Sequence, residues 1–93
     1  MIRNYRDRDT QAVAERRRVR RVPEDIQRRV QRKLMILNNA TSVADLRVPP
    51  GNRLEALSGD RDGQYSIRIN DQWRICFVWA EGNAYRVEIV DYH

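Results

Sequence analysis

The chain has 93 residues, enough for one compact domain spanning 1–93 and too few for a large organic cofactor inside its core. Charged residues make up 33% and hydrophobic residues 41%, the ordinary balance of a soluble globular domain. We find no membrane-spanning stretch and no signal peptide, so we expect a cytoplasmic protein with no membrane partner. The single cysteine, Cys76, excludes an internal disulfide and is interpreted as a small buried hydrophobic residue.

The net charge of +5 is carried by 17 arginines and one lysine and is concentrated in residues 1–40. That segment has 12 basic and 5 acidic residues, whereas residues 41–93 have 6 basic and 8 acidic ones. The arginine fork suits phosphate and carboxylate, so the clustering predicts a polyanion or an acidic protein as partner. Codon preference in a GC-rich genome is an alternative source of the arginine excess, but it does not account for the clustering.

Two helices are expected in the first half of the chain. Residues 2–5 fit a short edge strand, and Asp9 is predicted to cap a helix that begins at Thr10. Pro23 is a typical first-turn residue of a longer helix that ends near residues 38–39. This second helix has one apolar stripe, made of Ile26, Val30, Leu34 and Leu37.

A meander of antiparallel strands is expected after the stiff connector at residues 48–52. Short or alternating apolar segments predict strands within 54–57, 65–69, 73–79 and 85–89. The turns between them are predicted at residues 59–63, 70–71 and 82–83, with Asn70-Asp71 as a two-residue hairpin turn. The fold class is therefore α+β, with N-terminal helices packed on one face of a twisted antiparallel sheet. Residues 43–46 are expected to add a short helical turn.

The last strand leads into Asp91-Tyr92-His93, which is the strongest chemical signal in the sequence. Cleaving RNA without a metal needs a base, an acid and a cation that stabilises the phosphorane. Histidine serves as acid or base near neutral pH, and Arg74 on a neighbouring strand is a candidate for the cation. The chain-terminal carboxylate favours protonated His93, which leaves Asp91 as a base or an orienting group. A frayed terminus is the alternative interpretation.

The C-terminal half resembles the HigB-type (plasmid maintenance killer) toxins of the RelE/ParE superfamily. The resemblance is carried by the segments at residues 54–63, 65–70, 73–77 and 90–93, including Gly-Asp-Arg-x-Gly and the terminal Asp-Tyr-His. Residues 2–5 and the helix opening at Pro23 fit the same family. It implies a RelE-like fold, cleavage of mRNA in the ribosomal A site and neutralisation by a helix-turn-helix antitoxin that contacts DNA. It also implies catalytic roles for Arg74, Asp91, Tyr92 and His93.

This chain departs from the family pattern at two positions. Well-studied members carry a histidine and a lysine where this sequence has Glu55 and Ser58. Glu55 is a candidate base in place of the histidine; alternatively, its charge repels phosphate and signals a weak nuclease. Ser58, Arg53, Arg61 and Arg68 are candidate RNA contacts, and ion pairs with Asp60 or Asp62 are the alternative for the loop arginines.

Two further functions stay open on the sequence alone. A ParE-like gyrase poison on the same fold needs no proton-transfer groups, and a regulatory module would bind only its antitoxin and DNA. The basic block at 16–21 and the arginines at 28, 29 and 32 fit solvated surface, ribosomal RNA contacts or an antitoxin docking face. There is no glycine-rich phosphate loop, cysteine–histidine cluster or serine–histidine pair, so we expect no cofactor and no metal.

Overall fold

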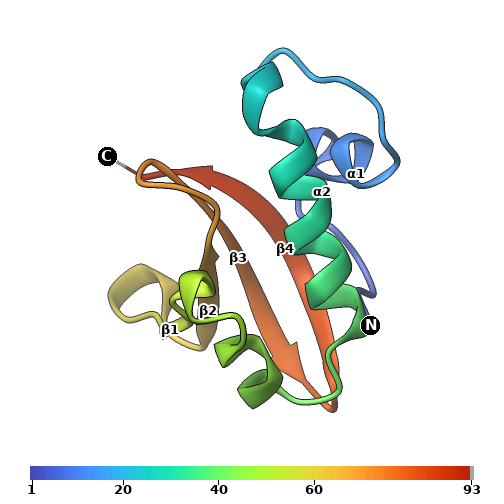
Figure 1. The fold of residues 1–93 in the computed structure, drawn as a ribbon. Coiled ribbons are helices and arrows are strands. Elements are labelled where there is room, and N and C mark those ends of the chain that lie inside the picture. The colour runs from blue at the N-terminus through green and yellow to red at the C-terminus, as the bar shows by residue number, and fades with distance from the viewer. Residues whose placement is uncertain (93) are drawn as a thin grey trace.

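The computed structural model describes residues 1–92 and places two helices before a four-stranded sheet (Figure 1). The helices and strands are α1 (Arg8–Ala14), α2 (Glu24–Asn39), β1 (Glu55–Ala56), β2 (Gln64–Arg68), β3 (Trp73–Ala80) and β4 (Asn83–Asp91). Short 3₁₀ turns at Val43–Arg47, Pro50–Asn52 and Gly59–Arg61 occupy the connections around β1. Among the described residues, no helix is both long and apolar enough to cross a membrane.

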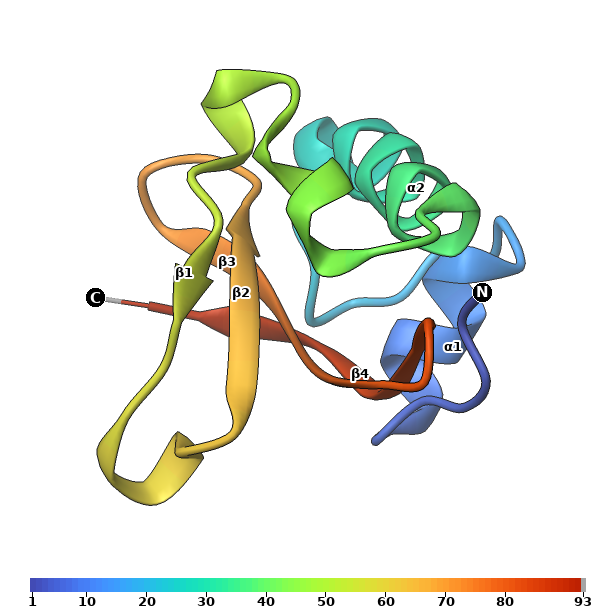
Figure 2. The same ribbon diagram turned by 90° about the horizontal axis from the view of Figure 1, so that it is seen from below.

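The sheet is a simple antiparallel meander with the order β1-β2-β3-β4. Both helices lie on the same side of it, and the strands β1 and β2 lie at the edge far from α1 (Figure 2). This is the α+β arrangement that the order of the predicted elements implied, so the predicted fold class is confirmed.

The core lies between α2 and one face of the sheet. The predicted helical stripe is buried there together with Ile67 of β2, Ile75 and Phe77 of β3, and Ile89 of β4. Ile67, Ile75 and Ile89 are paired across three strands and point the same way, because directly opposed residues in a sheet share a face. The opposite face of the sheet is therefore free of the helices.

The N-terminal segment differs from the prediction in two details. Asp7, not Asp9, caps α1, and its side chain accepts a hydrogen bond from the Thr10 backbone N–H at 2.7 Å. The helix starts two residues early because the capping oxygen must reach an N–H in the first turn. The predicted strand at residues 2–5 is reduced to two isolated parallel bridges, Ile2 to Ala84 and Tyr5 to Val87.

The connections between strands also differ from the prediction. The β2–β3 loop comprises residues 69–72 and not a two-residue turn, since the Asn70 side chain accepts from the backbone N–H groups of Gln72 and Trp73. The β3–β4 turn consists of Glu81 and Gly82, one residue earlier than expected, and both have positive φ. That is the geometry of a tight hairpin turn that matches strand twist.

Val87 and Ile89 of the predicted apolar file are buried in the core, but a β-bulge in β4 removes Tyr85 from it. The register shifts between Cys76 and Val78 of β3, and Arg86 has a φ of 53°. Beyond the bulge Ala84, not Tyr85, is fully buried against the core, and Tyr85 pairs with Val78. The extra residue on the bulged strand reverses the facing of every residue on its far side.

Asn52 anchors the connector between the helices and the sheet. Its side chain is fully buried, donates to the carbonyls of Leu46 and Val48 at 3.2 and 3.3 Å, and accepts from Lys33 of α2. Buried backbone carbonyls require such partners. The bonds fix the segment that ends at Arg53, whose own carbonyl takes part in the site described below.

We expect Asn52→Ala to lower the free energy of unfolding by about 1–3 kcal/mol, because two carbonyls and the Lys33 ammonium lose a partner. Chemical denaturation followed by circular dichroism measures the change. The matched control is Asn39→Ala on the exposed end of α2, which we expect to shift stability by less than about 0.5 kcal/mol. Equal stability of the two variants would contradict the anchoring role.

Candidate active site

The open face of the sheet carries polar side chains in two cross-strand rows. One row pairs Glu55, Ser66, Cys76 and Glu88 across β1 to β4, and the next pairs Arg68 with Arg74. These positions alternate with Ile67 and Ile75, which face the core. Alternation along β2 and β3 thus separates the packed face from a face that is available for chemistry.

Arg74 is the best-fixed cation on this face, with only 11% of its side chain exposed. Its Nε donates to Ser66 Oγ at 2.7 Å, and its Nη2 donates to the Arg53 carbonyl at 2.7 Å. Among residues 1–92, no group accepts a hydrogen bond from its Nη1. The guanidinium is therefore held rigidly through one edge, while Nη1 remains able to donate to an incoming anion.

A hollow of about 320 Å³ lies next to Arg74. It is lined by Arg53, Glu55, Arg68, Asn70, Asp71, Arg74 and Tyr92. Five of these were predicted as site residues from the sequence, so the fold brings together most of the predicted constellation. The Glu55 carboxylate lies 3.8 Å from Arg74 Nη2, and 58% of the Glu55 side chain is exposed. Arg68 pairs with Asp71 at the rim.

Tyr92 is pinned to the sheet beside this hollow. Its backbone N–H donates to the Gln72 carbonyl at 2.6 Å, and its hydroxyl lies 3.9 Å from Cys76 Sγ. Burial, with the neighbouring Cys76, raises the pKa of the Tyr92 phenol above its ordinary value of 10.0. Burial likewise raises the pKa of the Cys76 thiol. Tyr92 is therefore protonated at neutral pH and suits hydrogen-bond donation, not proton abstraction.

Asp91 is not brought next to Arg74. It pairs with Trp73 and so belongs to the other face of the strand, where its carboxylate accepts from Gln72 Nε2 at 3.0 Å. Gln72 thus bonds to both Asp91 and Tyr92, and this double contact holds the end of β4. The predicted role of His93 lies outside the described residues.

The remaining predicted RNA contacts, Arg61 and Ser58, do not line the hollow. Arg61 Nη1 donates to Glu88 Oε1 at 2.6 Å and to Gln64 at 3.1 Å, and the bond to Glu88 raises the pKa of the guanidinium. Its partner is Glu88 and not the loop residues Asp60 or Asp62. Ser58 is exposed and precedes the 3₁₀ turn at Gly59–Arg61.

Sequence reasoning missed Ser66 and Gln72, which position Arg74 and the strand end. Ser66 was detectable, because it lies two residues before Arg68 on a strand with a period of two. The role of Gln72 was not detectable from the sequence, because the contacts of a loop amide depend on which strands the loop joins. Residues 1–92 contain no group of three or more His, Cys, Asp or Glu side chains placed to hold a metal ion.

Comparison with known proteins places the chain in a family. The model described as "RelE-like toxin of type II toxin-antitoxin system HigB" matches residues 3–93, nearly the whole chain. The protein belongs to the HigB-like toxin family. The resemblance inferred from the sequence is therefore confirmed.

Two relatives and one solved structure are informative. Toxin HigB-1 of Vibrio cholerae is 47% identical over 68 residues, covering 73% of this chain and 72% of the relative. Endoribonuclease HigB of Proteus vulgaris is 31% identical over 97 aligned positions, covering 100% of both chains. A chain of the YoeB-YefM complex from Staphylococcus aureus superposes with a TM-score of 0.63 at 13% identity, covering 100% of this chain and 98% of that one. This last likeness supports the RelE-like toxin fold.

We expect Ser66→Ala to free the Arg74 guanidinium, because Nε loses its only side-chain acceptor. Solvent exchange of the Arg74 Nε–H, followed by ¹⁵N NMR, should accelerate at least about tenfold, since a bond to a charged group contributes roughly 1.5–3 kcal/mol. The exposed Arg86 in the same sample provides the reference rate. An unchanged Arg74 rate in the variant would show that Ser66 does not hold the guanidinium.

Proposed function

We propose that this HigB-like toxin is an endoribonuclease whose active site is the hollow next to Arg74. The observation that carries the proposal is the buried, immobilised guanidinium, which has a carboxylate and a protonated phenol at the same opening. A fixed cation among preorganised donors is what a developing phosphorane requires. The name of the relative from Proteus vulgaris agrees with this activity.

The proposed reaction is attack of a ribose 2′-oxygen on the adjacent phosphorus. Glu55 takes the 2′-hydroxyl proton, the new P–O bond forms, and Arg74 Nη1 stabilises the charge that gathers on the phosphoryl oxygens. The bond to the 5′-oxygen then breaks, and an acid returns a proton to the leaving group. We assign that acid to His93 and a hydrogen bond or base stacking to Tyr92. Asp91, through Gln72, acts as an orienting group for the strand end.

We further propose that no metal takes part, since Arg74 supplies the fixed positive charge, and that the substrate is mRNA on the ribosome. Arg53 and Arg68, which line the hollow, and Arg61 and Ser58, which lie on the loop after β1, are assigned to RNA contacts. The family description supports an antitoxin partner, which we propose to be a helix-turn-helix protein that links the toxin to DNA. Because the proposed substrate is mRNA on the translating ribosome, we propose that the toxin acts in the cytoplasm.

Arg74→Ala is expected to lower the rate of RNA cleavage by about 100-fold or more, the usual loss when one preorganised donor is removed. Expression of the wild type without an antitoxin should stop growth, with new 5′ ends in translated mRNAs. The Arg74→Ala variant should permit growth and still be folded. The matched control is Arg86→Ala, which removes an exposed arginine of β4, and this variant should stay toxic.

A fully toxic Arg74→Ala variant would refute the active site. Growth arrest with intact mRNA and accumulated cleaved gyrase–DNA complexes would instead identify a ParE-like gyrase poison. An absence of growth arrest from the wild type would favour a module that only binds its antitoxin and DNA.

Glu55→Gln is expected to slow cleavage by about 10²–10⁴-fold, because the amide cannot accept the 2′-hydroxyl proton. Glu55→His replaces one base with another and should recover most of the activity. Single-turnover cleavage of ribosome-bound mRNA measures both variants. If Glu55→Gln cleaves as fast as the wild type, the carboxylate is not the base; faster cleavage would show that its charge only repels the substrate.

A further inference from the structure

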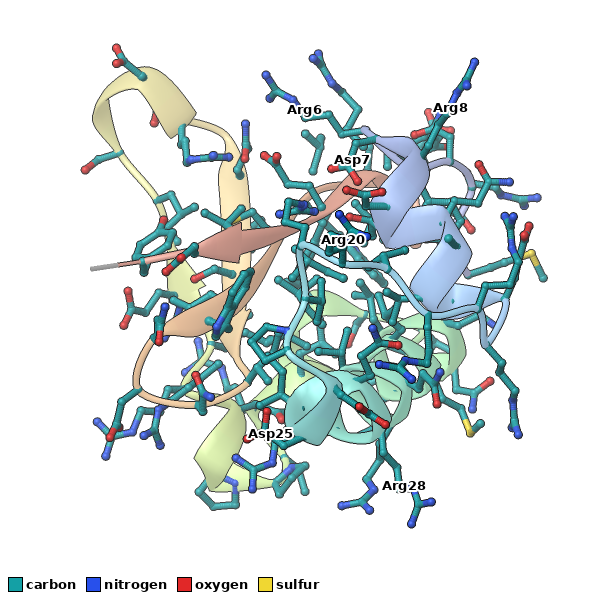
Figure 3. All side chains as sticks on the ribbon, turned by 90° about the horizontal axis from the view of Figure 1, so that it is seen from above. Arg6, Asp7, Arg8, Arg20, Asp25 and Arg28 are labelled. Atoms are coloured by element: carbon teal, nitrogen blue, oxygen red, sulfur yellow. The ribbon has the colours of Figure 1, made fainter. Side chains whose placement is uncertain are left out.

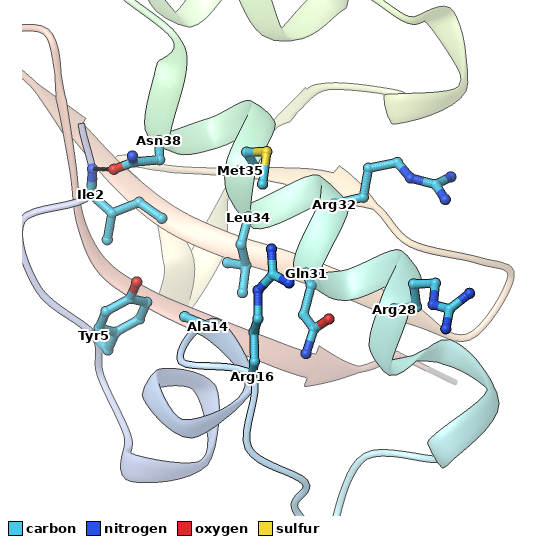
Figure 4. Close-up of a pocket in the computed structure, with 10 residues that line it drawn as sticks. All are labelled: Ile2, Tyr5, Ala14, Arg16, Arg28, Gln31, Arg32, Leu34, Met35 and Asn38. Atoms are coloured by element: carbon cyan, nitrogen blue, oxygen red, sulfur yellow. Dashed lines mark hydrogen bonds between the residues drawn. The ribbon is translucent and has the colours of Figure 1, made fainter.

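A second depression lies on the helical side of the molecule and shares no residue with the hollow next to Arg74. It has a volume of about 590 Å³ and runs between the N-terminal segment, the end of α1 and α2 (Figure 4). Along α2 it extends from Arg28 to Asn38, which is about 15 Å of helix. We call this depression the helical groove.

The floor of the helical groove is apolar, and its border is exposed. Tyr5, Ala14 and Leu34 form part of it, and Met35 borders it with 55% of the residue exposed. Met35 is one of the few large hydrophobic residues that the fold leaves in solvent. An exposed thioether at the border of an apolar floor suits an incoming apolar side chain, because methionine adapts its shape to what it contacts.

The rim of the helical groove is cationic. Arg16, Arg28 and Arg32 line it, and no acidic residue does. Figure 3 shows Arg28 projecting away from the body of the molecule, and Figure 4 shows Arg28 and Arg32 projecting from neighbouring turns of α2. Arg28, Arg32 and Met35 are spaced four and three residues apart, so they form one stripe on the helix.

The three rim arginines differ from their neighbours in the basic block. Arg17 pairs with Glu15, Arg18 with Glu24, and Arg21 with Asp7 and Asp9. For the side chains of Arg16, Arg28 and Arg32, residues 1–92 offer no such partner. Arg16 also has a φ of 65°, a backbone conformation that favours glycine, and yet carries a charged side chain at the groove.

We propose that the helical groove binds an acidic, amphipathic segment of the antitoxin, with an apolar side chain on the floor and carboxylates on the rim arginines. The inference rests on the proposed function only for the existence of the antitoxin. An amphipathic segment laid into a groove is a common recognition mode. Unpaired guanidiniums favour carboxylates, and the apolar floor favours a peptide over a nucleic-acid backbone, which is charged along its length.

Docking at the helical groove leaves the hollow next to Arg74 uncovered by that segment, because the two sites share no lining residue and the hollow opens on the sheet face away from the core. The antitoxin segment therefore binds the toxin without contacting the proposed catalytic side chains. Changes at the groove are expected to weaken antitoxin binding without changing RNA cleavage by the free toxin.

The test uses the full-length toxin and the protein encoded by the reading frame adjoining its gene, titrated by isothermal calorimetry. The R28E/R32E variant and the Met35→Asp variant should each bind at least tenfold more weakly than the wild type. The matched control is R20E/R86E, which makes the same charge change at two exposed arginines outside the groove and should bind within about twofold. Binding of both groove variants equal to that of the control would overturn the proposal.

A labelling experiment checks the same site without relying on charge. In a Met35→Cys variant the new thiol is exposed, whereas Cys76 is fully buried, so a maleimide should label residue 35 alone. The antitoxin should protect this thiol at least tenfold. If the thiol at residue 35 is labelled equally fast in the complex saturated with antitoxin, the proposal is wrong. It is also wrong if the groove variants still bind the antitoxin but no longer bind the ribosome, because the groove would then bind RNA.

Failure of the proposed function has a different signature. A wild-type protein that cleaves no RNA yet still binds its antitoxin through the helical groove would refute the nuclease and support the docking site. If the wild type cleaves RNA and the groove variants bind the antitoxin as tightly as the wild type, the nuclease is supported and the docking site is refuted.

Discussion

The alternation of side chains along β3 is the constraint on which the rest of the molecule depends. Ile75 and Phe77 point into the core under α2, while Arg74 and Cys76 point to the open face. A shift of one residue in the pairing of β3 would bury the arginine and expose the core. The same hydrophobic packing that stabilises the fold therefore fixes the position of the Arg74 guanidinium, so the packing of α2 indirectly determines the geometry of the proposed active site.

The strand sets the direction of the Arg74 side chain, but hydrogen bonds are needed to immobilise its guanidinium. A long, flexible side chain on an open sheet would lose entropy on binding phosphate, whereas this one is already held by Ser66 and by the Arg53 carbonyl. The Arg53 carbonyl is placed in turn by the buried Asn52, which links the connector to α2 through Lys33. Hydrogen bonds thus connect α2, through Lys33 and Asn52, to the connector that carries the Arg53 carbonyl, and this carbonyl accepts from Arg74 at the proposed phosphate site.

The sequence predicted the features that depend on periodicity. The apolar stripe of α2 and the alternating strands were sufficient to give the α+β layout, and the motifs around Arg74 and Tyr92 identified the family. What it could not predict depends on local geometry: the early cap at Asp7, the four-residue loop after β2, and the bulge at Arg86 that turns Tyr85 away from the core. Asp91, grouped with Tyr92 by sequence, lies on the other face because successive side chains of a strand point to opposite sides of the sheet.

In the proposed reaction, the fixed guanidinium of Arg74 and the carboxylate of Glu55 cleave RNA through the ribose 2′-hydroxyl. The most direct measurement is the chemistry of the product ends, determined by mass spectrometry of ribosome-bound mRNA cut by the purified toxin. We expect a 2′,3′-cyclic phosphate or its 3′-phosphate hydrolysis product on the upstream fragment and a 5′-hydroxyl on the downstream fragment. A 3′-hydroxyl with a 5′-phosphate, or cleavage of a substrate with 2′-deoxyribose at the cut site, would contradict this reaction.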